Sequence, residues 1–194
     1  MARIVLASTS PYRRELLQRL RLPFDVLAPR VDEAALPAEA PRATAQRLAR
    51  AKAEEVAARA ADACVIGSDQ VADVEGVALS KPGSHEAALE QLERMQGRTI
   101  VFHTALAVVD AARGNALVDC VPTAVRFRRL PRAALEAYLR AEQPYDCAGA
   151  AKIEGLGIAL VDAVESDDPT ALIGLPLIRL TAMLEELGIP VLPR

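Results

Sequence analysis

Aromatic residues, cysteines and histidines are all scarce in this sequence. It has no tryptophan, and aromatic residues make up only 3% of its 194 positions. The three cysteines, Cys64, Cys120 and Cys147, are far apart and form no Cys-x-x-Cys pair, which argues against a zinc site or a redox dithiol. The two histidines, His85 and His103, have no metal-ligand spacing. We therefore expect free thiols in a reducing cytoplasm, and a carboxylate as any general base.

Long apolar runs and an excess of one charge are also missing. The formal net charge is only −3, and the basic residues are spread along the chain, which argues against a nucleic-acid polymer as partner. No stretch reaches membrane-spanning length, and the first apolar run, residues 4–7, is too short for a signal peptide. We expect a cytoplasmic protein with no membrane partner. No Gly-x-x-x-x-Gly-Lys-Ser/Thr or Gly-x-Gly-x-x-Gly motif is present, which argues against a P-loop enzyme and a dinucleotide-binding oxidoreductase.

Apolar residues make up 52% of the chain, enough to bury a substantial core. We expect one domain over residues 1–194. Strand-like runs alternate with helical patterns, which predicts an α/β fold. Because an antiparallel hairpin at about 100–129 interrupts the order, the sheet should be mixed. The expected strands are 3–7, 24–27, 64–68, a hairpin pair around Glu75 and Gly76, and a longer pair around the turn at Arg113, Gly114 and Asn115.

Helical patterns cover residues 11–20, 41–61, 85–95, 131–142 and 176–187. Ser10 before Pro11, and Asp168 before Pro169, each resemble an N-cap followed by proline at the first helical position. Gly188 is typical of a helix end.

Hydroxyl groups gather where the first strand meets the first helix, at Ser8, Thr9 and Ser10. Exposed backbone donors and a helix dipole suit an anion such as phosphate there. Arg13 falls on the buried sector of this helix and should lean back toward the hydroxyls. A helix cap with an ordinary surface arginine is the alternative.

Lys52 lies near the centre of an apolar stripe on the second helix. Its side chain either follows the stripe to water or meets a buried anion at the edge of the stripe.

The strongest local signal is an apolar strand that turns polar at Ser68, Asp69 and Gln70. Ligands of α/β proteins gather at such strand ends, although an aspartate there can simply cap a turn. Glu33 and Lys81 offer acidic and basic partners. Two carboxylates could share Mg²⁺ with substrate phosphates, while Lys52, Lys81 and Arg13 neutralise the phosphate chain.

Taken together, these motifs resemble the Maf family of nucleotide pyrophosphatases over essentially the whole chain. The matching segments are Ala7-Ser8-Thr9-Ser10-Pro11-Tyr12-Arg13-Arg14-Glu15-Leu16-Leu17, Val31-Asp32-Glu33, Ala51-Lys52-Ala53, Gly67-Ser68-Asp69, Lys81-Pro82, Ala148-Gly149-Ala150 and Gly174-Leu175-Pro176.

The resemblance implies a fold like that of the inosine triphosphate pyrophosphatases, with an elongated mixed sheet flanked by helices and a cleft between two lobes. It also implies a nucleoside triphosphate substrate, a divalent metal cation (Mg, Mn or Co) and a homodimer. By position, Asp69 corresponds to the family's proton acceptor, and the other cleft residues are Ser8, Arg13, Glu33, Lys52 and Lys81. We expect Glu33 and Asp69 to hold the metal, and Ser8 and Ser10 to contact substrate.

Three positions distinguish branches of the family. The branch acting on dTTP and UTP has Arg, Thr and Gln where this chain has Tyr12, Gln70 and Glu154, so the chain instead resembles the branch that hydrolyses 7-methyl-GTP in a house-cleaning role. Tyr12 could attract a cationic base, Glu154 could accept from the ring N–H and the amine, and Gln70 could add an amide contact. The alternatives are a dTTP/UTP or non-standard purine triphosphate pyrophosphatase, a nucleotide-binding regulator of septum formation, and a Glu154 that is only a solvated loop residue.

Overall fold

The structure is a computed structural model that describes residues 3–79 and 81–192, and in those ranges seven strands form one mixed sheet. The strand order is β2-β1-β3-β5-β6-β7, with β4 paired to β3. β1 pairs in parallel with β2 and β3, and the other pairings are antiparallel. The predicted α/β fold with a mixed sheet is confirmed. The strands are β1 (Arg3–Ala7), β2 (Phe24–Leu27), β3 (Ala63–Val74), β4 (Val77–Leu79), β5 (Thr99–Asp110), β6 (Asn115–Phe127) and β7 (Val161–Ser166).

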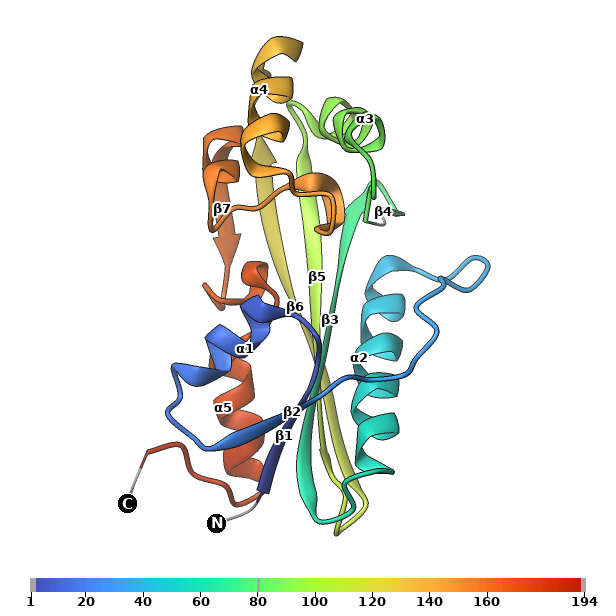
Figure 1. Cartoon of the computed structure of the whole chain (residues 1–194), viewed down its shortest axis with the longest axis vertical. Helices are drawn as coiled ribbons and strands as arrows, with labels where there is room; N and C mark the ends of the chain where they lie inside the picture. The colour runs from blue at the N-terminus through green and yellow to red at the C-terminus, as the bar shows by residue number, and fades with distance from the viewer. Residues whose placement is uncertain (1–2, 80, 193–194) are drawn as a thin grey trace.

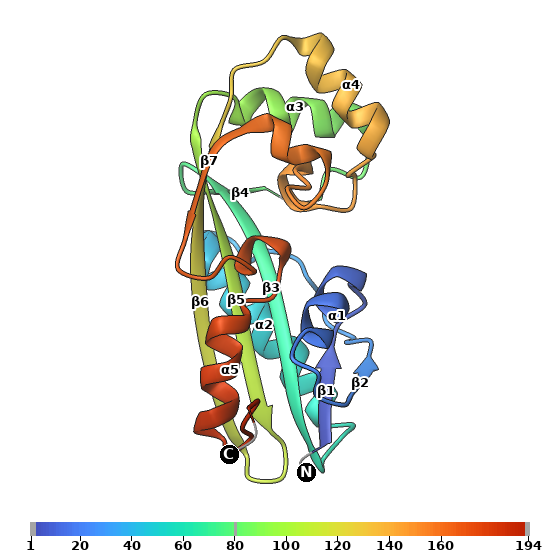
Figure 2. The ribbon, with the colours of Figure 1, turned by 90° about the vertical axis from the view of Figure 1, so that its left-hand side faces the viewer.

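The described ranges contain five α-helices, which pack in two groups at the two ends of the elongated sheet and so form two lobes (Figure 1). In the lower lobe, as oriented in Figure 1, α1 and α5 cover one face of the sheet and α2 covers the other. In the upper lobe, α3, α4 and residues 148–160 lie on one side of the long strands (Figure 2). No helix among the described residues is long and apolar enough to cross a membrane. The helices are α1 (Pro11–Gln18), α2 (Pro41–Ala57), α3 (His85–Met95), α4 (Arg132–Glu142) and α5 (Leu177–Glu186).

Each lobe has its own apolar core. Along β1, Val5 packs in the core under α2, whereas Ile4 and Leu6 pack with α1 and α5. The strand is therefore buried on both faces, which explains its continuous apolar run. In the upper lobe, Ile100 and Phe102 of β5 pack against α3 and α4.

Most local signals in the sequence are confirmed. The Ser10 side chain accepts a hydrogen bond from the Arg13 backbone N–H at the start of α1. Glu75 and Gly76 both have positive φ, 54° and 85°, as a two-residue type I′ hairpin requires. Gly188 has φ 79° and follows α5, and the Ile189 N–H closes the helix end on the Leu184 carbonyl.

The expected helix start at Asp168 and Pro169 is wrong. Asp168 is 2% exposed, and its carboxylate accepts from the backbone N–H of Thr170 and, farther along the chain, of Ile178. It therefore caps α5, which begins at Leu177, across an intervening loop. A cap residue that lies so far before its helix leaves no local sequence signal.

Two boundaries and one strand also differ from expectation. α2 ends at Ala57, short of residue 61, because the chain turns so that buried Ala60 joins the core leading into β3. β3 continues past residue 68 to Val74, since β4 and β5 pair with its second half. β7 was not predicted, because it is a mostly exposed, acidic strand at the edge of the sheet.

The edge of β3 is interrupted between its two short partners. β1 pairs with β3 from Ala63 to Gly67, and β4 pairs with it from Ala72 to Val74. Neither partner reaches Ser68–Val71, although β5 pairs with β3 along the other edge throughout. This gap lies between the two lobes. It leaves the polar residues Ser68, Asp69 and Gln70 without a neighbouring strand on this edge, so a ligand can approach them.

Candidate functional site

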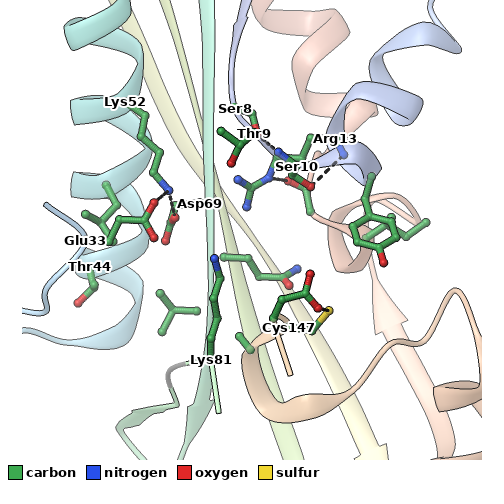
Figure 3. A pocket seen from close by; sticks show the side chains of 18 of the residues that line it. Ser8, Thr9, Ser10, Arg13, Glu33, Thr44, Lys52, Asp69, Lys81 and Cys147 are labelled. Carbon is green, nitrogen blue, oxygen red and sulfur yellow. Dashed lines mark hydrogen bonds and ion pairs between the residues drawn. The ribbon is translucent and has the colours of Figure 1, made fainter. Parts of the chain in front are cut away.

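A cavity of about 620 Å³ opens at the gap in the β3 edge and is lined by residues of both lobes. All of the site candidates from the sequence line this cavity. Figure 3 shows the labelled side chains reaching a common space from the turn before α1, from α1, α2 and β3, and from the segments before α2, after β4 and after α4. The sequence candidates in the lining are Ser8, Ser10, Tyr12, Arg13, Glu33, Lys52, Asp69, Gln70, Lys81 and Glu154.

The turn from β1 into α1 forms one wall of the cavity. Ser8 accepts from the backbone N–H of Ser10 at 3.0 Å, and Ser10 accepts from that of Arg13 at 3.4 Å. The first turn of α1 contains no acidic residue, so the positive end of the helix dipole is not neutralised from within the helix. This wall can attract an anion.

Arg13 reaches across the sequence to the loop before α5. Its Nε donates to the Gly174 carbonyl at 2.8 Å, and a Cβ atom on Gly174 would lie only 3.3 Å from that nitrogen. Burial lowers the pKa of Arg13, while the charges of Asp69 and Glu33 act to raise it. A poorly hydrated guanidinium beside two carboxylates is a strong point of attraction for a phosphate group.

Lys52 on α2 bridges the two predicted carboxylates. Its Nζ lies 2.7 Å from Asp69 Oδ1 and 2.7 Å from Glu33 Oε1, as Figure 3 shows. Lys52 is 5% exposed and Asp69 is 7% exposed, so this ion pair is sequestered. The prediction that Lys52 meets an anion at the edge of its apolar stripe is confirmed, and the alternative of a side chain that runs out to water is wrong.

A glycine allows α2 to approach β3 closely enough for this ion pair. A Cβ atom on Gly67 would lie 2.8 Å from the Ala53 backbone nitrogen and 2.9 Å from the Ala53 side chain. Real Cβ atoms do not approach other atoms that closely, so the helix packs directly on the strand backbone at this position. Lys52 directly precedes Ala53 on α2, and Asp69 lies two residues after Gly67 on β3.

Nearby cations lower the pKa of Glu33. Partial burial alone would raise the pKa of Glu33, but the hydrogen bond from Lys52 and the charges of Lys52, Lys81 and Arg13 leave it lowered. Figure 3 shows Lys81 extending into the cavity from the β4 side. Glu33 is therefore ionised throughout the neutral range.

The carboxylates suit a hard divalent cation that is shared with a ligand. No group of three or more His, Cys, Asp or Glu side chains in the described ranges could hold a metal ion by itself. Lys52 binds one oxygen each of Asp69 and Glu33. Since Mg²⁺ takes one or two carboxylates together with phosphates and waters, these two residues fit such an ion only when a ligand supplies the other oxygens.

Gln70 projects from β3 with its amide orientation fixed by the protein. Its Nε2 lies within 2.9 to 3.1 Å of the Thr104 hydroxyl and the carbonyls of Ala171 and Leu172. These acceptors use up both amide hydrogens. Gln70 can therefore meet a ligand only through its carbonyl oxygen, as a hydrogen-bond acceptor.

Tyr12 already contacts a cation of the protein. The Lys152 Nζ lies 5.4 Å from the centre of the Tyr12 ring and 2.8 Å from Glu142. Tyr12 lines the cavity, whereas Lys152 is not among the described lining residues. Its charge is balanced by Glu142 on α4.

Glu154 lies in the loop after Lys152 and lines the cavity. Burial raises its pKa, partly opposed by Lys152 and aided by Glu142 and Asp146. Glu154 is an exposed residue of this loop, so its role in binding a ligand stays a prediction.

Several lining residues were missed from the sequence. They are Thr44 on α2, and Asp146 and Cys147 in the loop after α4. Ser68 was noted only as part of a motif, yet its hydroxyl contacts the carbonyls of Ala105 and Gly174 at 2.8 Å each. A signal for this loop was the polar Asp146, two residues before the small-residue segment 148–150.

Comparison with known proteins agrees with this geometry. The profile of the family described as "Maf-like protein" matches residues 3–187. A Burkholderia thailandensis protein named 7-methyl-GTP pyrophosphatase is 58% identical over 98% of this chain and 90% of its own length. Proteins of the same name from Albidiferax ferrireducens and Cupriavidus metallidurans are 56% and 57% identical, over 98% and 96% of this chain and 96% and 94% of their own lengths. A match of this extent shows that the chain belongs to the Maf family of nucleotide pyrophosphatases.

Proposed function

We propose that this protein hydrolyses 7-methyl-GTP to 7-methyl-GMP and pyrophosphate. The observation that carries the proposal is the meeting, in one cavity, of the Lys52–Asp69–Glu33 cluster with the wall from Ser8 to Arg13. The name shared by relatives 56% to 58% identical over nearly the full chain supports the same substrate.

The triphosphate would lie between α1 and α2. Arg13, Lys52 and Lys81 line the cavity from different elements and together offset the charge of the phosphate chain. Preorganised cations stabilise the additional charge that develops on phosphate oxygens in the transition state. The backbone N–H groups at the start of α1 add donors for the same oxygens.

Asp69 would accept the proton of the attacking water. The water oxygen bonds to the α-phosphorus, the bond from that phosphorus to the α–β bridging oxygen breaks, and its electron pair leaves with pyrophosphate. Lys52, 2.7 Å from Asp69 Oδ1, holds the carboxylate in place before the reaction. A divalent cation (Mg, Mn or Co) held by Glu33 and Asp69 would withdraw electron density from the phosphate oxygens.

The base would lie against Tyr12, between Gln70 and Glu154. Glu154 can accept from the ring N–H and the exocyclic amine together, which uracil and thymine cannot offer. The fixed carbonyl oxygen of Gln70 is a further acceptor beside it. The Tyr12 ring face can contribute about 0.5 to 2 kcal/mol of cation–π attraction to the methylated ring, reduced by the Lys152 ammonium that already contacts it.

A substrate panel tests this function. Purified protein would be given 7-methyl-GTP, GTP, dTTP, UTP and ITP with Mg²⁺, Mn²⁺ or Co²⁺, and pyrophosphate and inorganic phosphate would be measured separately. We expect the highest kcat/KM for 7-methyl-GTP, with pyrophosphate as the only phosphate product. A preference for dTTP or UTP would contradict the substrate assignment, and the absence of turnover with any triphosphate and metal would contradict the reaction.

We also infer a cytoplasmic homodimer, as the family resemblance implies. Light scattering on the purified protein measures the oligomeric state directly, and a monomer at micromolar concentration would contradict this inference.

A further inference from the structure

We sort the charged side chains that line the cavity into two groups, according to the part of the substrate that each is proposed to meet. The first, here called the phosphate end, combines three cations with two carboxylates. The second, here called the base end, presents two carboxylates and, among the described lining residues, no cation. The phosphate end consists of Ser8, Arg13, Glu33, Lys52, Asp69 and Lys81, and the base end consists of Tyr12, Gln70, Asp146 and Glu154.

Different charged neighbours act on the carboxylates of the two ends. The pKa of Glu33 is raised by partial burial and lowered by Lys52, Lys81 and Arg13. The pKa of Glu154 is raised by burial, lowered by Lys152, and raised by Glu142 and Asp146. Lys152 is paired with Glu142 at 2.8 Å, and among the described residues neither Asp146 nor Glu154 forms an ion pair.

We infer that Asp146 is a specificity-determining residue which, together with Glu154, selects a purine base that carries a positive charge. The inference rests on the proposed function and extends it, because it names the property of the base that is read. A nucleotide with a cationic base and an anionic phosphate chain matches the charge separation of the cavity, whereas GTP has a neutral base.

The hydrogen bonds proposed for this site cannot distinguish a charged, methylated guanine from neutral guanine. Methylation at the imidazole ring leaves the ring N–H and the exocyclic amine of guanine in place, so Gln70 and Glu154 can accept from either base. A carboxylate near the base favours the charged ring through its field, even where it makes no hydrogen bond to the base. Such a group raises discrimination without adding a contact.

The loop holds Asp146 in position before any ligand arrives. The Cys147 Sγ donates to Asp146 Oδ1 at 3.5 Å, and Figure 3 places Cys147 across the cavity from Lys52. The preceding residue, Tyr145, accepts from the Gly83 N–H through its carbonyl at 3.0 Å. The backbone next to Asp146 is therefore anchored to the same segment that carries Lys81.

The test compares Asp146→Asn with wild type on 7-methyl-GTP and GTP. We expect the ratio of the two kcat/KM values to fall about three- to tenfold, the scale of one partly screened charge pair, mainly through a higher KM for 7-methyl-GTP. Asp146→Glu should keep most of the preference. Glu90→Gln, which removes an exposed carboxylate from α3 in the same lobe, should leave the ratio unchanged.

Salt concentration separates a charge effect from a change in shape. The wild-type preference for 7-methyl-GTP should decline as salt is raised, since salt screens the partly exposed carboxylate, and the decline should be shallower in Asp146→Asn. An unchanged ratio in Asp146→Asn would overturn the inference while leaving the proposed function intact. Failure of the wild type to hydrolyse 7-methyl-GTP would instead overturn the proposed function.

Discussion

The two ends of the cavity are built in different ways. At the phosphate end, Lys52 on α2 binds both Asp69 on β3 and Glu33 at 2.7 Å. At the base end, Tyr12 and Gln70 come from α1 and β3, whereas the carboxylates Asp146 and Glu154 lie in loops and are exposed. The difference indicates that the ion pair at the proposed reaction centre joins two secondary-structure elements, while loops present the carboxylates proposed to choose the base.

The gap in the β3 edge accounts for both ends. Ser68 and Gln70 contact carbonyls of the loop before α5, whereas Asp69 between them meets Lys52 on α2. Because successive side chains of a strand point to opposite faces, three consecutive residues supply groups to both sides of the sheet. A ligand that enters the gap can therefore reach both sets.

The largest effect should follow from removing the proposed proton acceptor at the phosphate end. Asp69→Asn should lower kcat about 100- to 10,000-fold, the usual contribution of a general base, while nucleotide affinity changes little. Pyrophosphate release and a nucleotide-binding titration measure the two quantities. Asp73→Asn, on the same strand beyond the cavity, is the matched control, and full activity in Asp69→Asn would remove this residue from the mechanism.

Breaking the ion pair should affect both stability and activity. Lys52→Met leaves the buried Asp69 carboxylate without its partner, so the free energy of unfolding should fall by about 3 kcal/mol and kcat/KM should fall as well. Arg50→Met removes an exposed pair with Glu54 on the same helix and should cost less than about 0.5 kcal/mol. Denaturant unfolding measures both, and equal losses in the two variants would contradict the sequestered pair.

At the base end, Gln70→Leu should weaken all guanine nucleotides alike. Its carbonyl oxygen reads an edge that GTP and 7-methyl-GTP share, so kcat/KM for each should fall about tenfold, the cost of about one lost hydrogen bond to substrate, with their ratio preserved. This behaviour contrasts with that expected of Asp146→Asn. A change confined to one of the two substrates would show that Gln70 reads the methylation itself.

The smallest expected effect concerns Glu154 and pH. Burial raises its pKa, so the folded protein favours the protonated form, and the ionised carboxylate opposes folding once the pH rises through that pKa. Glu154→Gln should therefore be slightly more stable than wild type at pH 8, by no more than about 0.5 kcal/mol, with the difference vanishing in acid. Thermal melting across this range tests the sign, and a destabilised variant at pH 8 would contradict it.

Local chemistry made much of the phosphate end predictable. Lys52 was visible as a charge in an apolar stripe, and Asp69 as an acid at the end of an apolar run, because burial and strand ends leave a pattern in neighbouring residues. The Ser10 cap and the turn at Glu75 and Gly76 follow from short-range rules of the same kind.

Contacts between distant segments could not be predicted. Arg13 binds the carbonyl of Gly174, 161 positions away, and Asp168 caps α5 across a loop. Lys152 reaches Tyr12 from the other lobe, which no periodicity of either segment indicates. The base end was therefore less accessible to sequence reasoning, and Asp146 was missed because a loop aspartate is ordinarily explained by its turn.

A crystal structure of the Asp69→Asn variant with 7-methyl-GTP and Mg²⁺ tests the charge-separated cavity most directly. The account predicts the triphosphate between Ser8–Arg13 and Lys52, with the methylated base on Tyr12 beside Asp146 and Glu154. A nucleotide bound in the reverse orientation, or with its base in solvent away from these carboxylates, would contradict it.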